Sequence, residues 1–337
     1  MYSFQNDYSE GAHPRILSAL NTTNLAQTSG YGTDPYTAEA ASLIRKQLKN
    51  DAVMVHFLSG GTQTNLIALS AFLRPHEAAV CADTGHINVH ETGAIEAIGH
   101  KVIAVPSADG KLTPHDLMTV LAHHTDEHMV KPRLVYISDA TEIGTCYAKA
   151  ELTALREFCT AHGLLLYLDG ARLGSALCCT DLTLPDICAL TDAFYIGGTK
   201  NGALLGEALV IVNPALMADI RYIIKQRGGM LAKGRLLALQ FSELFRDGLY
   251  FELAEHANRL ADTLREGISQ AGYTFLSNSP SNQLFPVFPD ALAQRFVNEF
   301  RCEVWGKTDD THTCIRLVTS WATEPEAVDA FLAALKG

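Results

Sequence analysis

The sequence predicts an α/β protein with a large, mainly parallel sheet flanked by helices, followed by a smaller C-terminal α+β unit. Short apolar runs without polar alternation recur between longer amphipathic segments, which is typical of strands covered by helices on both faces. After about residue 245 the pattern changes to one long helical segment followed by shorter strands. We therefore predict two domains, residues 1–245 with an N-terminal arm and residues 246–337.

The apolar runs mark the expected strands of the larger unit. They cover residues 53–57, 78–81, 102–105, 134–137, 164–168, 193–196 and 208–212. Helices are expected between them over residues 62–73, 113–124 and 149–162. Each begins near a polar cap, and the last ends before Gly163. In such sheets ligands gather at the carboxyl ends of the strands, so the residues that follow the strands are the candidate functional residues.

The C-terminal unit is expected to begin with a long helix. The helices expected there cover residues 250–271, 290–300 and 324–335, and short strands are expected near residue 275 and over 283–288 and 314–319. Helices that alternate with such short strands are typical of an α+β unit.

The composition is that of an ordinary globular protein. Of the 337 residues 47% are hydrophobic and 19% are charged. The formal net charge is −11 and no basic run occurs, so nucleic acid is not an expected partner. No apolar stretch approaches the roughly 20 residues that span a bilayer, and the first residues do not resemble a signal peptide. We expect no membrane association and a cytoplasmic location.

Cysteine usage agrees with that location. The eight cysteines are Cys81, Cys146, Cys159, Cys178, Cys179, Cys188, Cys302 and Cys314, and they occur in mostly apolar surroundings. We expect reduced, buried thiols, which are usual in the cytoplasm. None forms a CxxC pair, so no metal site is predicted.

Two residues at strand ends indicate a cofactor. Lys200 follows the strand at 193–196 after small residues, and such a lysine is a candidate for forming a Schiff base. Asp169 ends the preceding strand. Pyridoxal 5′-phosphate (PLP) needs these two groups, a lysine for its aldehyde and a carboxylate that keeps its pyridine nitrogen protonated. Their spacing of 31 residues, 200 − 169, corresponds to about one strand-helix-strand unit, so both are expected at one edge of the sheet.

A glycine-rich turn supplies the third requirement, a phosphate site. Gly60, Gly61 and Thr62 lie between a predicted strand and a predicted helix, where backbone N–H groups and the helix dipole favour an anion. Such turns also occur as simple connections in α/β sheets. The turn matches neither a Walker loop nor the GxGxxG fingerprint, which argues against a nucleotide-dependent oxidoreductase.

Three further side chains are candidates for contacts with cofactor and substrate. His86 follows the strand that ends near Cys81, so it can stack on a cofactor ring or move protons, although a packing role is about equally expected. Arg172 lies close to Asp169, and Arg316 lies within an apolar strand. A guanidinium group binds a carboxylate in two places, so both arginines are candidates for holding an amino-acid carboxylate.

Together these residues resemble the low-specificity L-threonine aldolases, PLP-dependent enzymes of the aspartate-aminotransferase-like fold (fold type I) within the wider β-eliminating lyase group. The resemblance extends over almost the whole chain. Its markers are Asn6-Asp7, Tyr31-Gly32 before a helix, Gly61-Thr62-Gln63, His86 with Glu91, Asp169-Gly170-Ala171-Arg172, Gly198-Thr199-Lys200 and Ile315-Arg316-Leu317-Val318. The Asp-Gly-Ala-Arg run with a strand-end lysine is specific, whereas the other markers are individually weak.

The resemblance implies a role for each matching residue. Lys200 binds the PLP aldehyde, Asp169 faces the pyridine nitrogen and His86 stacks on the ring. Gly61 and Thr62 bind the phosphate, while Arg172 and Arg316 bind the substrate carboxylate. Family members are dimers or tetramers, in which residues corresponding to Tyr31 and Lys233 reach the neighbouring subunit's site.

Two positions depart from the family pattern. Many members have a serine where this chain has Asn6 and a second active-site histidine where it has Glu142. Asn6 can still hydrogen-bond a carboxylate. Glu142 is a different acid–base group, so the base that removes the β-hydroxyl proton can be His86, Glu142 or Glu91.

The resemblance implies cleavage of L-threonine or L-allo-threonine, and of related β-hydroxy-α-amino acids, to glycine and an aldehyde. β-Elimination or racemisation of serine-like or aromatic amino acids uses the same first steps and remains an alternative. A non-catalytic homologue is a third hypothesis, against which the complete set of lysine, aspartate and arginines argues.

Overall fold

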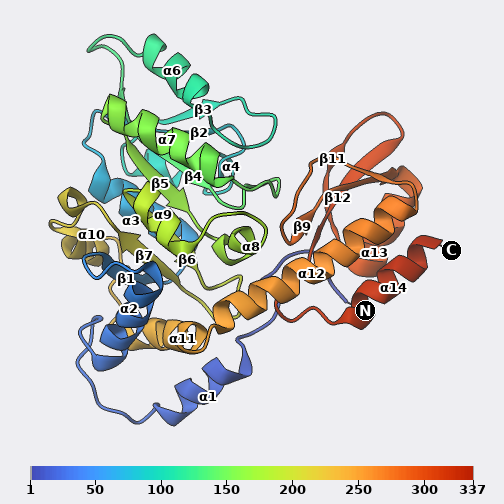
Figure 1. Cartoon of the computed structure of the whole chain (residues 1–337), viewed down its shortest axis with the longest axis horizontal. Helices are drawn as coiled ribbons and strands as arrows, with labels where there is room; N and C mark the ends of the chain where they lie inside the picture. Colours follow the sequence, from blue (N-terminus) through green and yellow to red (C-terminus); the bar gives the residue numbers. More distant parts are fainter. Residues whose placement is uncertain (1, 337) are drawn as a thin grey trace.

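The computed structural model describes residues 2–336 and contains two sheets (Figure 1). The larger sheet has seven strands in the order β1-β7-β6-β5-β4-β2-β3. They are β1 (Met54–Leu58), β2 (Glu77–Ala82), β3 (Val102–Val105), β4 (Lys131–Ser138), β5 (Leu165–Asp169), β6 (Ala193–Gly197) and β7 (Glu207–Ile211). Only β7 runs against its neighbours β1 and β6, whereas the other pairs are parallel. The predicted mainly parallel sheet is therefore confirmed.

Helices cover both faces of this sheet. The helices of this part of the chain are α1 (Pro14–Thr22), α2 (Pro35–Leu48), α3 (Gly61–Phe72), α4 (His86–Val89), α5 (Ala94–Ala97), α6 (Pro114–His123), α7 (Lys149–His162), α8 (Leu173–Cys178), α9 (Leu184–Leu190), α10 (Ile220–Gln226) and α11 (Arg235–Arg246). Of these, α1 packs mainly against α11. The predicted helices correspond to α3, α6 and α7 to within one residue at each end. Along β5, Leu166 and Leu168 belong to one hydrophobic cluster and Leu165 and Tyr167 to another, which explains why its strand sequence is apolar throughout.

The second sheet lies in the C-terminal part of the chain, at the far end of a long helix (Figure 1). Its elements are α12 (Leu249–Gln270), β8 (Thr274–Phe275), β9 (Gln283–Leu284), β10 (Pro286–Pro289), α13 (Asp290–Phe300), β11 (Glu303–Lys307), β12 (His312–Val318) and α14 (Pro325–Lys336). The strand predicted over 283–288 is divided into β9 and β10, and β11 was not predicted at all. The domain boundary after residue 245 stays a prediction.

The N-terminal arm connects the two parts of the molecule. Phe4 is fully buried in the hydrophobic cluster of the C-terminal part, and its backbone bonds Phe300 and Val318. Further along, the His13 N–H donates to the Gly202 carbonyl, in the larger unit. The residues between these two anchors are thereby held between the units.

Two of the predictions concern the burial of the cysteines and the helices that could cross a membrane. The prediction that all eight cysteines are buried is wrong, because Cys178 is exposed and Cys146 and Cys179 are half-buried. Cys178 and Cys179 lie at the end of the short helix α8, and Cys146, in the loop before α7, lies against Cys179 with 3.5 Å between the two sulfur atoms. Within residues 2–336, no helix has both the length and the apolar character required to cross a membrane.

Candidate active site

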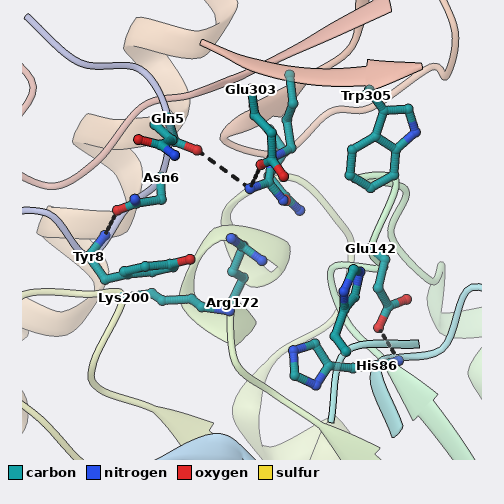
Figure 2. A pocket seen from close by; sticks show the side chains of 12 residues that line it. Gln5, Asn6, Tyr8, His86, Glu142, Arg172, Lys200, Glu303 and Trp305 are labelled. Carbon is teal, nitrogen blue, oxygen red and sulfur yellow. Dashed lines mark hydrogen bonds and ion pairs between the residues drawn. The ribbon is translucent and has the colours of Figure 1, made fainter. Parts of the chain in front are cut away.

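The largest cluster of predicted site residues lines a cavity of about 350 Å³ between the two units and the N-terminal arm. It is lined by Gln5, Asn6 and Tyr8 from the arm, by His86, His90, Glu142, Arg172 and Lys200 from the larger unit, and by Gln283, Glu303, Trp305 and Arg316 from the C-terminal part (Figure 2). The predicted residues His86, Glu142, Arg172, Lys200, Arg316 and Asn6 are therefore brought together from distant parts of the chain.

Lys200 follows β6 after a short turn and extends toward the ring of Tyr8, 6.0 Å from its Nζ atom (Figure 2). Burial lowers the pKa of Lys200, and the positive charge of Arg172 lowers it further. The carboxylates of Asp7, Asp169 and Glu207 oppose this shift only in part. A lysine with a lowered pKa carries more of the neutral amine, which is the nucleophilic form.

Asp169, at the end of β5, is held by four hydrogen-bond donors. Tyr136 and Tyr195 donate from their hydroxyls at 2.6 and 2.5 Å, Asn65 from its amide at 2.9 Å and Ala171 from its backbone N–H at 3.0 Å. Burial raises the pKa of Asp169, but the charge of His86 and these side-chain hydrogen bonds outweigh it and lower the pKa below its ordinary value. Asp169 is thus kept as a carboxylate inside the protein.

His86 is connected to Asp169 through buried side chains. The His86 Nδ1 atom lies 2.9 Å from Glu91 Oε1, and the Asn65 amide donates both to that oxygen and to Asp169. Burial lowers the pKa of His86, whereas the hydrogen bond to Glu91 and the charge of Asp169 raise it, with a net rise. Glu91 is buried and does not line the cavity, so it acts on the cavity through His86.

The glycine-rich turn lies next to Asp169. Gly60 caps α3 with extended backbone and no side-chain hydrogen bond, and the first helical bond runs from Thr64 N–H to Gly60. The N–H groups before Thr64 therefore remain for a ligand. A Cβ atom on Gly61 would lie 3.0 Å from the hydroxyl of Tyr195, the same hydroxyl that bonds Asp169.

Arg172 is held in place by a carboxylate that the sequence did not single out. Its Nε and Nη2 atoms donate to the two oxygens of Asp7 at 2.7 and 3.1 Å, and the Asn282 amide donates to Asp7 at 3.0 Å. Burial raises the pKa of Asp7, but the charges of Arg172 and Lys200 lower it overall. The run Asn6-Asp7 marked the family resemblance, yet nothing local shows that Asp7 meets a residue 165 positions away.

Arg316, on β12, is also partnered. It forms an ion pair with Glu303, bonds the Gln5 carbonyl at 3.4 Å and lies 5.6 Å from the centre of the Trp305 ring (Figure 2). Burial lowers the pKa of Arg316, and the charge of Arg172 acts in the same direction. Glu303 and Trp305 were missed because they lie on β11, whose mixed exposure leaves no apolar run in the sequence.

Glu142 and Asn6 occupy opposite sides of the cavity (Figure 2). Glu142 Oε1 accepts from the backbone N–H of His86 at 2.9 Å and from the Ser138 hydroxyl at 2.7 Å. Burial raises the pKa of Glu142 above its ordinary value. The oxygen of Asn6 accepts from Tyr8 N–H and the Ser9 hydroxyl, so its amide group is the part left for a ligand.

Tyr31 and Lys233 do not line this cavity. Tyr31 lines a separate hollow with His56 and Arg221, and Lys233 lies in a third one beside Arg235. The two segments touch, since Tyr31 N–H donates to Ala232. A role for either residue at a neighbouring subunit's site stays a prediction.

The sheet, with a buried aspartate and a lysine at the ends of neighbouring strands, defines the fold type I class of PLP-dependent enzymes. Residues 12–290 match the family described as Beta-eliminating lyase, and the chain belongs to this family.

Several proteins that are similar to this chain are named threonine aldolases. The low specificity L-threonine aldolase of Pseudomonas sp. (strain NCIMB 10558) is 36% identical over 77% of this chain and 76% of its own length. The protein of the same name from Pseudomonas aeruginosa is 31% identical over 96% and 94%. The solved structure of Leishmania major threonine aldolase is 49% identical, with a TM-score of 0.98 over 100% of this chain and 99% of that one.

Proposed function

We propose that this protein is a PLP-dependent aldehyde-lyase of the threonine aldolase type. It cleaves L-threonine or L-allo-threonine, and related β-hydroxy-α-amino acids, to glycine and an aldehyde, which is acetaldehyde for both threonines. The observation that carries the proposal is the meeting of Lys200, Arg172 and Arg316 in one cavity beside Asp169. The similarity to threonine aldolases over nearly the whole chain supports it.

Lys200, which lines the cavity, and Asp169 and the turn at Gly61, which lie outside its lining, fit the chemical groups of PLP. An aldehyde needs an amine, which Lys200 supplies with a lowered pKa. A protonated pyridine nitrogen needs a carboxylate, and four donors keep Asp169 ionised. A phosphate needs N–H donors, which Gly61 and Thr62 offer at the uncapped start of α3. When bound, PLP supplies an electron sink that stabilises negative charge at the substrate Cα.

The arginines and Asn6 orient the substrate. Asp7 accepts hydrogen bonds from the Nε and Nη2 atoms of Arg172. The Nη1 atom of Arg172 is therefore the nitrogen that can bind a carboxylate in the cavity. Arg316 and the Asn6 amide supply further donors from the opposite side. Orientation matters because the bond that breaks must stand perpendicular to the cofactor ring.

Of the three candidate bases, the geometry favours Glu142. Glu142 and His86 line the cavity, whereas Glu91 lies behind His86. The raised pKa of His86 leaves less of the neutral imidazole that can accept a proton, while Glu142 has a pKa raised toward the working range of a base. We therefore assign removal of the β-hydroxyl proton to Glu142 and the stacking position above the cofactor to His86.

We further propose that the protein works as a homodimer or homotetramer. Large hydrophobic side chains are exposed in the region of Tyr31, among them Leu25 at 90% and Tyr222 at 76% exposure. Exposed hydrophobic side chains are typical of a surface that binds another subunit. At this surface Tyr31 and Lys233 would contact the active site of the neighbouring subunit. The molar mass in solution, measured by light scattering, tests this.

A cytoplasmic location stays a prediction from the cysteine usage.

Replacing Asp7 by asparagine is expected to raise the KM for the amino acid by about tenfold or more and to lower the free energy of unfolding by about 3 kcal/mol. The side chain is 1% exposed and neutralises Arg172, so its loss leaves a buried guanidinium without its counter-charge. Steady-state kinetics and urea unfolding measure the two effects.

Asp262→Asn provides the control for this variant. It breaks an exposed ion pair within α12, between Asp262 and Arg265, which contributes about 0.5 kcal/mol or less. An unchanged KM in Asp7→Asn would show that Asp7 does not orient Arg172 for the substrate.

The proposed activity is tested with a panel of amino acids. The purified protein, supplied with PLP, is incubated with L-threonine, L-allo-threonine, phenylserine and serine, and the products are identified. Glycine with an aldehyde supports the proposal. A keto acid would indicate β-elimination instead, and the opposite enantiomer would indicate racemisation. Absence of any product would favour a non-catalytic homologue.

A further inference from the structure

Glu207 is a buried carboxylate for which the proposed reaction has no role so far. It is the first residue of β7 and is 4% exposed. Its Oε2 atom accepts from the Gly198 N–H at 2.9 Å, and its Oε1 atom accepts from the Thr199 hydroxyl at 2.8 Å. Both donors belong to the turn that leads directly from β6 to Lys200. A buried carboxylate is costly unless it is hydrogen-bonded, and both oxygens of Glu207 accept hydrogen bonds from this turn.

The turn is enclosed on both sides by backbone. On one side, Gly197 N–H donates to the Gly170 carbonyl at 2.9 Å, and a Cβ atom on Gly197 would come within 2.3 Å of Ala171. On the other side, a Cβ atom on Gly198 would come within 2.7 Å of the Gly206 carbonyl. The turn is therefore packed closely between Gly170 and Ala171 on one side and Gly206 on the other.

Thr199 provides a second hydrogen bond between the turn and Glu207. Its hydroxyl donates to Glu207 and accepts from the Gly206 N–H at 3.0 Å, so a single side chain closes a small ring of hydrogen bonds. Among the described residues, Glu207 is the one carboxylate that hydrogen-bonds this turn. Lys200 is the next residue along the chain. Its direction into the cavity thus depends on a turn that Glu207 holds.

We propose that Glu207 is a positioning residue for Lys200: it clasps the Gly198-Thr199 turn so that the lysine amine points into the cavity. This inference rests on the proposed function, in which Lys200 binds the PLP aldehyde. Glu207 has no hydrogen bond to Lys200 and acts through the turn and through its field.

Glu207 also acts on the pKa of Lys200 through its charge, as other charged groups do. The charged groups that act most on Lys200 are Arg172, which lowers its pKa, and Asp7, Asp169 and Glu207, which raise it. The charges of His86 and His90 also interact with that of Lys200. Burial raises the pKa of Glu207 to about 7. Above that pH Glu207 is mainly ionised and favours the protonated lysine, so removal of its charge lowers the pKa of Lys200.

Two substitutions separate the clasp from the charge. In Glu207→Gln the amide oxygen can accept from Gly198 and the NH₂ group can donate to Thr199, so the clasp is kept without the charge. Glu207→Ala removes both. Thr199→Val removes one hydrogen bond of the clasp and serves as a second variant if Glu207→Ala does not fold. Glu77→Gln is the matched control, because Glu77 is likewise a buried glutamate that begins a strand.

Two measurements on the whole 337-residue chain test the proposal. PLP affinity is determined by absorbance titration. Separately, the cofactor-free protein is methylated with formaldehyde and cyanoborohydride across a pH series, and the modification of Lys200 is quantified by peptide mass spectrometry. The second measurement needs neither PLP nor turnover. If the wild-type protein cleaves no amino acid, the proposed function fails while the Lys200 comparison still tests Glu207.

We expect Glu207→Ala, and to a smaller degree Thr199→Val, to weaken PLP binding by about tenfold or more. Glu207→Gln should keep most of the affinity but lower the pH at which Lys200 is half-reactive. Glu77→Gln should match the wild type in both. If the variants at 207 only lower the unfolding temperature and leave PLP affinity and the Lys200 profile unchanged, Glu207 is merely structural and the proposal is wrong.

Discussion

Replacing Lys200 by alanine is expected to abolish turnover, with a loss of about 10⁴-fold or more, and to prevent borohydride from linking PLP covalently to the chain. Lys200 is the one lysine among the residues that line the cavity. Its lowered pKa supplies the neutral amine that an aldehyde requires. Activity is followed by aldehyde release from threonine, and attachment by mass spectrometry after reduction.

Two further variants make this test specific. Lys200→Arg keeps the positive charge, yet a guanidinium stays protonated and cannot act as the nucleophile, so it should be as inactive as Lys200→Ala. Lys101→Ala removes an exposed lysine just before β3 and should behave like the wild type. Full activity in Lys200→Ala would refute the assignment of Lys200 and of the cofactor site together.

Replacing Glu142 by glutamine is expected to lower kcat by about 10²- to 10⁴-fold, the range for loss of a general base. The glutamine oxygen can still accept from the His86 N–H and the Ser138 hydroxyl, so the local structure should persist. PLP binding should therefore remain, which separates loss of the base from loss of the site.

The pH dependence gives a second test of Glu142. A base works when ionised, so the wild-type kcat is expected to fall as the pH drops through the pKa of Glu142, which burial raises above that of an ordinary carboxyl. This acid limb should disappear in Glu142→Gln. The hydrogen bond from Ser138 lowers the pKa of Glu142, so Ser138→Ala should move the limb to higher pH. An unchanged limb in Glu142→Gln would transfer the role of base to another group.

The fold and much of the site could be predicted because their signals are local. An apolar run of five residues identifies a covered strand, and the polar residue that ends it must lie at the ligand edge of the sheet. Lys200 and Asp169 were found in this way, since β5 and β6 are neighbours in the sheet. The strand β11 escaped prediction because half-exposed residues leave no such run, and Glu303 and Trp305 were missed with it.

The partners of the site residues carry no local signal. Tyr136, Tyr195 and Asn65 come from β4, β6 and α3, yet all three donate to Asp169. Asp7 meets Arg172 only because the arm is anchored at Phe4 in the other unit. Contacts of this kind depend on how whole elements pack, and no spacing along the chain encodes them.

By itself the sequence determined which residues are the candidates for the chemistry of this protein: a strand-end lysine, a strand-end aspartate, a glycine-rich turn and two arginines, each recognisable from its neighbours along the chain. Tertiary structure alone decided their state. Burial and packed partners lower the pKa of Lys200, keep Asp169 ionised, raise the pKa of Glu142 and place Glu207 under the turn that carries the lysine. The physical reason is that desolvation and charge interactions depend on distances through space, which exist only once the two units and the arm have closed around the cavity.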